Sequence, residues 1–140
     1  MMTLEQVILL ATQAHEGQVD KGGNPYIDHP IAVMNRVSTL HEKMAAVLHD
    51  VVEDTRWSFD DLRKVGVPEE VVDAVDALTR REDETYMEFV ARAKKHPIAR
   101  NVKIADIFEN LDLSRIPNPT QRDHDRLKRY KKALVFLQEK

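Results

Sequence analysis

Residues 45–55 read Ala-Ala-Val-Leu-His49-Asp50-Val-Val-Glu53-Asp54-Thr, so four polar side chains follow one another within little more than two turns of a helix. At 100° per residue these four share an arc of roughly 140°, and the apolar residues between them face the other way. Repulsion among the three carboxylates destabilises such a helix unless a cation lies against this face. We therefore expect one face to carry chemistry; the alternative is a solvated helix end beside a half-buried histidine.

The composition limits how this chemistry can be built. At 140 residues the chain predicts one domain, residues 1–140, that is large enough to bury a core. It contains no cysteine, so histidines and carboxylates must hold any metal ion. No apolar run is long enough to cross a membrane, and the first residues lack the basic segment of a secretory signal. We expect a cytoplasmic protein with no membrane partner.

The charges exclude another class of partner. The net charge is -3 and the acidic and basic residues are interspersed, which argues against general nucleic-acid binding. A polyanionic small substrate would then need a local basic patch. Two candidate patches are Arg80-Arg81 and the C-terminal run that contains Arg122, Arg126, Lys128, Arg129, Lys131 and Lys132.

Apolar residues recur at helical spacing along most of the chain, and no alternating strand pattern rises above them. Thr3 with Gln6 and Thr85 with Glu88 have the spacing of capping boxes, and Ser58 is placed to cap a further helix. The sequence predicts an all-α fold, a compact array of about eight short helices. We expect these helices over residues 3–17, 30–40, 43–54, 58–66, 68–78, 85–95, 97–111 and 120–139.

Four residues with metal-binding side chains stand at separate places in the chain, namely His29, His49, Asp50 and Asp106. Two neutral imidazoles and two carboxylates suit Mn²⁺ or Fe²⁺, or alternatively Zn²⁺, and leave positions for water and a substrate oxygen. Glu53 and Asp54 follow one turn later and are placed to orient or deprotonate that water. This set predicts a metal-assisted hydrolase.

Each assignment has a simpler alternative. His29 precedes a proline and would serve equally well to bond a turn, and Asp106 would pair with Lys103 on the surface. The apolar neighbours of Asp106 indicate instead a partly buried carboxylate that needs a strong partner. Spacing in the sequence does not by itself show that the four residues meet in space.

The order of these residues resembles the four-ligand pattern of the HD phosphohydrolase superfamily. Longer motifs are similar to the hydrolase domain of the RelA/SpoT family, and the lack of a synthetase region resembles its single-domain members, the small alarmone hydrolases. The resemblance extends from about Leu4 to Leu137. Its motifs are Ala14-His-Glu-Gly-Gln18, Pro25-Tyr-Ile-Asp-His-Pro30, Leu48-His-Asp-Val-Val-Glu-Asp-Thr55, and Val102-Lys-Ile-Ala-Asp106 with Asn110.

The resemblance implies an HD-domain fold and removal of the 3′-pyrophosphate of ppGpp or pppGpp, with a bound Mn²⁺ and with GDP or GTP and pyrophosphate as products. The partner is then a small phosphorylated nucleotide. The metal ligands carried over are His29, His49, Asp50 and Asp106, and Glu53 and Asp54 match the pair that marks hydrolase-competent members. The substrate contacts carried over are Lys21, Asn110, Arg126 and Tyr130, although an ordinary helix surface would also explain the last two.

One position departs from the family pattern. Asp20 stands where the family usually has an arginine near the purine, and an aspartate offers neither guanidinium donors nor a stacking plane. Guanine is therefore less certain than the pyrophosphohydrolase chemistry. The alternatives are hydrolysis of an adenine alarmone, a general HD nucleotidase or NADPH phosphatase, and an alarmone-binding sensor without turnover.

Overall fold

The computed structural model describes residues 1–112 and 116–139, and within these ranges it contains nine α-helices and no β-strand. The predicted all-α class is confirmed. No helix in these ranges is long and apolar enough to span a bilayer. The helices are α1 (Leu4–Ala14), α2 (Asp28–Met34), α3 (Leu40–Leu48), α4 (Val51–Asp54), α5 (Phe59–Lys64), α6 (Glu69–Ala77), α7 (Tyr86–Lys95), α8 (Pro97–Asn110) and α9 (Gln121–Gln138).

Capping boxes set the first residue of five helices. In each, a Ser or Thr side chain accepts a hydrogen bond from the backbone N–H three residues later, and that residue's side chain accepts one from the capping residue. Three of these, at Thr3, Ser58 and Thr85, are where the sequence places a cap. The box at Thr39 corrects the sequence analysis, because α2 ends at Met34 rather than near residue 40 and α3 begins directly after Thr39.

The centre of the larger hydrophobic core is α3. Its residues from Met44 to Leu48 are at most 1% exposed, so the second half of this helix is apolar on all sides rather than on one face. It packs against α1, α2, α6 and α8. The turn that follows it, which carries His49 and Asp50, is consequently held in place by the whole core.

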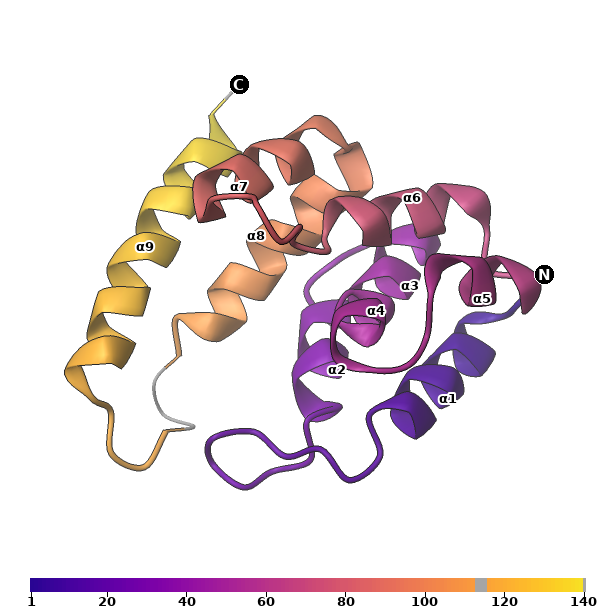
Figure 1. The fold of residues 1–140 in the computed structure, drawn as a ribbon, viewed down its shortest axis with the longest axis horizontal. Coiled ribbons are helices and arrows are strands. Elements are labelled where there is room, and N and C mark those ends of the chain that lie inside the picture. The colour runs from indigo at the N-terminus through magenta and orange to yellow at the C-terminus, as the bar shows by residue number, and fades with distance from the viewer. Residues whose placement is uncertain (113–115, 140) are drawn as a thin grey trace.

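Helix α8 separates this core from a smaller one. Figure 1 shows α9 along one side of α8, with α1 to α6 on the other. The smaller core consists of Val90, Ile107, Ala133 and Leu137, from α7, α8 and α9. Side chains of α8 therefore reach both the core beneath the candidate chemistry and the space facing α9.

The predicted continuous helix over residues 43–54 is wrong, because α3 and α4 are separated at His49 and Asp50. The backbone N–H and the Nδ1 atom of His49 both contact the Ala46 carbonyl oxygen, at 3.4 and 2.6 Å. A side-chain bond to a backbone carbonyl competes with the regular helical ladder. Glu53 and Asp54 consequently belong to a separate short helix, α4.

Candidate active site

The orientation of the His49 ring at this break suits metal binding. The Ala46 carbonyl oxygen can only accept, so Nδ1 of His49 donates the hydrogen and Nε2 faces the cluster. A histidine held through one nitrogen in this way presents the other to a metal ion. Burial lowers the pKa of His49, but the Asp50 carboxylate outweighs it and raises this pKa well above the usual range. The cluster thus strongly favours a positive charge.

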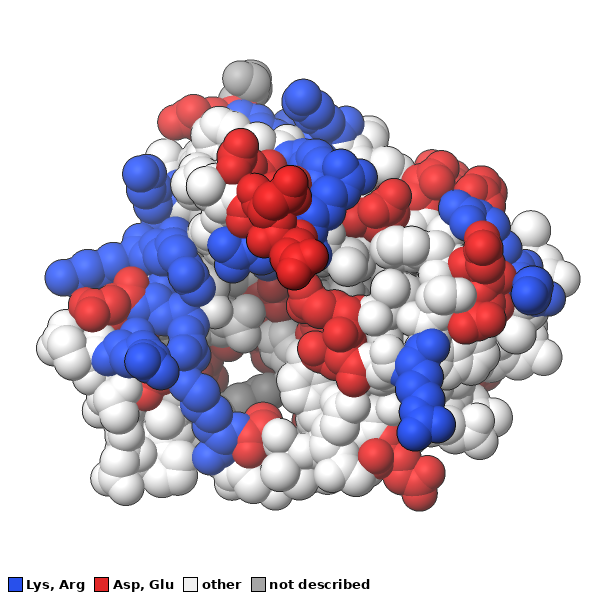
Figure 2. All heavy atoms as spheres, viewed as in Figure 1, with Lys and Arg blue, Asp and Glu red and all other residues white. Residues whose placement is uncertain are grey.

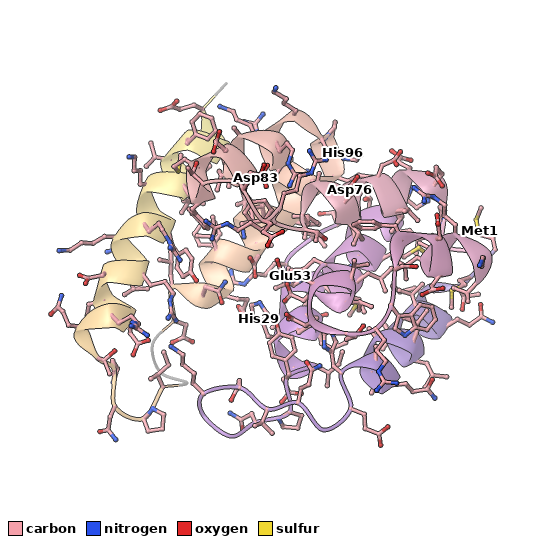
Figure 3. All side chains as sticks on the ribbon, in the orientation of Figure 1. Met1, His29, Glu53, Asp76, Asp83 and His96 are labelled. Carbon is pink, nitrogen blue, oxygen red and sulfur yellow. The ribbon has the colours of Figure 1, made fainter. Side chains whose placement is uncertain are left out.

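The four predicted ligands meet in space. Ligand atoms of His29, His49 and Asp50 lie within 4.8 Å of one another, an arrangement that could hold a metal ion. Asp106 joins them, since its Oδ1 lies 2.8 Å from Nε2 of His29 and 3.4 Å from Nε2 of His49. Helix α2, the α3–α4 turn and α8 each contribute to this cluster, and Figure 3 labels His29 beside the space between α4 and α8.

Three neighbours orient the carboxylates. The Tyr26 hydroxyl donates to Oδ2 of Asp50, Asn110 donates to Oδ1 of Asp106 at 3.2 Å, and Lys103 donates to Oδ2 of Asp106 at 3.1 Å. Lys103 and Asp106 are only 8% and 5% exposed, so the expected surface location of this alternative pair is wrong. The sequence signal for Lys103 was its position three residues before Asp106, on the same helix face.

Electrostatics keep both carboxylates ionised. Burial opposes ionisation of Asp106, but the Lys103 ammonium and the two imidazoles outweigh it and hold the pKa of Asp106 well below its usual range. Burial likewise opposes ionisation of Asp50, but His49 and the Tyr26 hydroxyl bring its pKa down to about 2. Ionised carboxylates are the form that coordinates a divalent cation.

Glu53 and Asp54 lie on the short helix α4, directly after the cluster, and both are exposed. Burial and the charges of Asp50 and Asp54 raise the pKa of Glu53, while burial and Asp50 raise the pKa of Asp54. Figure 3 shows Glu53 facing the same central space as His29. Two carboxylates with raised pKa values beside a cation site are suited to accept a proton.

A pocket of about 470 Å³ opens next to the cluster and is visible in Figure 2 as the hollow beside α9. Its wall includes His29, Asp50 and Asp106 from the cluster. All four residues predicted to contact the substrate also line it, namely Lys21, Asn110, Arg126 and Tyr130. Residues from the α1–α2 loop, α8 and α9 therefore share one cavity.

Asp123, which the sequence analysis did not identify, organises the basic side of this pocket. Its Oδ1 lies 2.9 Å from Nζ of Lys21 and 3.6 Å from a guanidinium nitrogen of Arg126. Its backbone N–H and its Oδ2 complete the capping box with Thr120. The position of Asp123 three residues after Thr120 predicts a helix cap, but this spacing does not predict the ion pair with Lys21.

Asp20 lines the same pocket and stabilises the loop that contains it. Its Oδ1 accepts hydrogen bonds from the backbone N–H groups of Gly22 and Asn24, both at 2.9 Å. Gly23 within this turn has a φ of +82°, a conformation that favours glycine. The aspartate therefore shapes the loop that carries Lys21, a role that an arginine at this position would not fill.

Known proteins are similar to this chain in fold or in sequence. A solved structure described as a metazoan SpoT orthologue that hydrolyses ppGpp and plays a role in starvation responses has a TM-score of 0.80 and 29% identity; the match covers 96% of this chain and 84% of that one. The guanosine-3′,5′-bis(diphosphate) 3′-pyrophosphohydrolase of Haemophilus influenzae is 40% identical over 86 residues, and the GTP pyrophosphokinase of Streptomyces coelicolor is 34% identical over 147 residues.

These alignments cover 57% and 96% of this chain but only 13% and 16% of the two bacterial proteins. The chain therefore spans only a small part of the length of each of them. A family model of the HD domain matches residues 8–113. This range contains all four residues of the cluster and most of the residues that line the pocket. On this match and on the fold, the chain belongs to the HD domain family.

Proposed function

We propose that this protein removes the 3′-pyrophosphate of guanosine polyphosphate alarmones, converting ppGpp or pppGpp to GDP or GTP and pyrophosphate. The observation that carries the proposal is the convergence of two imidazoles and two carboxylates beside a pocket lined by Lys21 and Arg126. The ppGpp hydrolysis described for the structural neighbour and the pyrophosphohydrolase activity for which the Haemophilus influenzae relative is named support it. The cytoplasmic location expected from the sequence remains a prediction.

The donor set fits a divalent cation, and we assign His29, His49, Asp50 and Asp106 as its ligands. Nitrogen and oxygen donors without a thiolate suit Mn²⁺, which we propose as the ion, and would also accept Fe²⁺ or Zn²⁺. The Nδ1 bond of His49 and the Tyr26 bond to Asp50 would keep these ligands in place. When bound, the ion would supply positive charge that polarises the phosphoryl group and acidifies a water molecule.

The residues of the chain would divide the remaining tasks. Glu53 and Asp54 would orient the attacking water and take its proton, since their pKa values are raised toward neutrality. The water oxygen bonds to the phosphorus attached to O3′, the bond from that phosphorus to O3′ breaks, and O3′ takes up a proton. Lys21 and Arg126, both held in place by Asp123, would bind the remaining phosphates, with Asn110 and Tyr130 along the nucleoside.

Asp20 keeps the identity of the base open. Its carboxylate lines the pocket where a guanidinium would otherwise stack on a purine, so an adenine alarmone or NADPH is the second candidate substrate. A sensor that binds alarmone without hydrolysing it is the non-enzymatic alternative. The pair Glu53 and Asp54 argues against that alternative, because binding alone has no need of two carboxylates repelling a polyanion.

A product assay tests the proposal. The protein is incubated with Mn²⁺ and ppGpp, pppApp or NADPH in parallel, and pyrophosphate is resolved from orthophosphate. We expect pyrophosphate from ppGpp, and its loss in Asp106→Ala but not in the exposed control Asp73→Ala. Pyrophosphate from pppApp alone would identify adenine, and orthophosphate from NADPH would identify a phosphatase. Three intact nucleotides with metal-loaded protein would overturn the enzyme proposal.

A further inference from the structure

The two basic patches of the sequence each contribute one arginine to the same aromatic ring. The guanidinium carbon of Arg129, on α9, lies 4.5 Å from the centroid of the Tyr86 ring, and that of Arg80, after α6, lies 5.9 Å from it. Both distances are within the range of cation–π contact. Two like charges on one ring still repel each other, and both side chains are exposed at this position.

Neither arginine is neutralised by the protein. Within residues 1–112 and 116–139, no carboxylate forms an ion pair with Arg80 or Arg129; Arg80 donates only to the backbone carbonyl of Glu84, at 3.3 Å. By contrast, Arg63 and Arg92 each hold a carboxylate oxygen at 3.0 Å or less. The hydroxyl oxygen of Tyr86 is buried and also has no partner in those ranges. The two exposed guanidinium groups are thus left for an external acceptor.

This group adjoins the metal-ligand cluster. Nζ of Lys103 lies 5.8 Å from the Tyr86 centroid and 3.1 Å from Oδ2 of Asp106. The backbone N–H of Arg80 lies near enough to the Glu53 carboxylate to oppose the rise of its pKa, so Arg80 adjoins a proposed catalytic residue. Tyr86 and Lys103 therefore connect the arginine pair to Asp106 of the cluster.

The segment that carries Arg80, between α6 and α7, lies on the side of the cluster away from the Lys21 loop. In Figure 1 the segment between α6 and α7 and the loop between α1 and α2 are at opposite ends of the space beside α8 and α4. Arg80, Tyr86 and Arg129 do not line the pocket that contains Lys21 and Arg126. A substrate whose nucleoside occupies that pocket and whose reacting phosphorus lies at the cluster would project its next phosphate toward the pair.

A 3′-diphosphate has such a phosphate and a 3′-monophosphate does not. The terminal phosphate stays bonded to the reacting phosphorus throughout and leaves with it as pyrophosphate. Guanidinium groups bind phosphate oxygens through paired, charge-assisted hydrogen bonds. We propose that Arg80 and Arg129, held on Tyr86, bind the terminal phosphate of the 3′-diphosphate and select diphosphate over monophosphate esters, an inference that rests on the proposed function.

The test compares two nucleotides that differ only in this phosphate. Guanosine 5′-diphosphate 3′-diphosphate and guanosine 5′-diphosphate 3′-monophosphate are assayed with Mn²⁺-loaded wild type, Arg80→Ala and Arg129→Ala. We expect each variant to lower kcat/KM for the diphosphate about tenfold and to change that for the monophosphate less than about twofold, as for one charged hydrogen-bonding partner. Lys128→Ala, an exposed cation on the same helix, should change neither.

A binding measurement gives a readout apart from turnover. Calorimetric titration of the same Mn²⁺-loaded proteins with pyrophosphate and with orthophosphate should show weaker pyrophosphate binding in Arg129→Ala and unchanged orthophosphate binding. If the wild type hydrolyses the diphosphate but each variant keeps the wild-type ratio of kcat/KM between the two nucleotides, the subsite alone would be overturned. Hydrolysis of neither nucleotide by the wild type would overturn the proposed function and the subsite with it.

Discussion

The Lys21 ammonium and the Asp123 carboxylate lie 2.9 Å apart, although 102 positions separate them in the chain. Asp123 is 5% exposed, so this ion pair is covered on one side by the protein. It ties the α1–α2 loop to the first turn of α9 across the pocket. This pair consequently helps to set the width of the pocket at this point.

Asp123→Asn should destabilise the protein in a pH-dependent way. Lys21 and the Thr120 backbone N–H hold the pKa of Asp123 far below its usual range. In the unfolded chain the pKa of an aspartate is about 3.9. The contribution of the ion pair to the free energy of unfolding is therefore fully present above that pH and is lost as the pH falls from there through the folded pKa. Urea unfolding of metal-free protein should therefore separate wild type and variant at pH 7, and the difference should shrink steadily as the pH falls below about 4. A difference that does not shrink in acid, or one shared by Asp125→Asn, would contradict the role of this pair.

Glu53→Gln and Asp54→Asn should each keep the metal ion and lose turnover. Removing a residue that positions and deprotonates water lowers kcat by about 10² to 10⁴. Metal content by elemental analysis and kcat with ppGpp together separate this effect from loss of the ion. Asp73→Asn, an exposed carboxylate on α6, serves as the matched control. Full turnover in both variants would remove them from the mechanism.

The pH dependence of kcat should show an acid limb above the usual carboxyl range. The pKa values of Glu53 and Asp54 are raised, so these groups take up protons, and activity falls, at a higher pH than about 4. The charge of Asp54 contributes to the rise at Glu53. The residual activity of Asp54→Asn should then have its acid limb at lower pH, measured at saturating Mn²⁺. A limb that stays in place would exclude Glu53 as the titrating group.

Asp106→Ala should remove the metal ion and also destabilise the metal-free protein. The substitution leaves the Lys103 ammonium buried without its carboxylate, a change that costs about 3 kcal/mol or more in other proteins. The double variant Asp106→Ala, Lys103→Met should recover much of this free energy of unfolding without regaining metal. Equal stability of the single and double variants in urea would show that Lys103 finds another partner.

Asp20→Ala should raise KM, whereas Asp20→Asn should leave it nearly unchanged. The Asn side chain retains the oxygen that accepts from Gly22 and Asn24, so it preserves the loop that positions Lys21. An unchanged KM in Asp20→Ala would show that the loop holds its shape without this bond. Comparing ppGpp with pppApp in Asp20→Asn tests the carboxylate charge separately, because a shift in base preference there identifies the charge as the selecting feature.

Local hydrogen bonding explains which helix ends were predictable. The caps at Thr3, Ser58 and Thr85 involve residues three positions apart, so their spacing in the sequence is sufficient to identify them. The end of α2 and the break at His49 were missed. In the first case the same kind of box at Thr39 was overlooked, and in the second the His49 side chain displaced a regular helical bond, which periodicity does not reveal.

The amino-acid sequence by itself determined the helical class and the residue types of the candidate centre, because helix periodicity, capping and ligand chemistry are local properties. That His29, His49, Asp50 and Asp106 meet within one cluster was decided only by the packing of α2, α3 and α8. Packing likewise decided the burial of Lys103, the Lys21–Asp123 pair and the meeting of Arg80 with Arg129 on Tyr86. These contacts join residues far apart in the chain, and their existence depends on how apolar helix faces fit together, which no spacing along the sequence records.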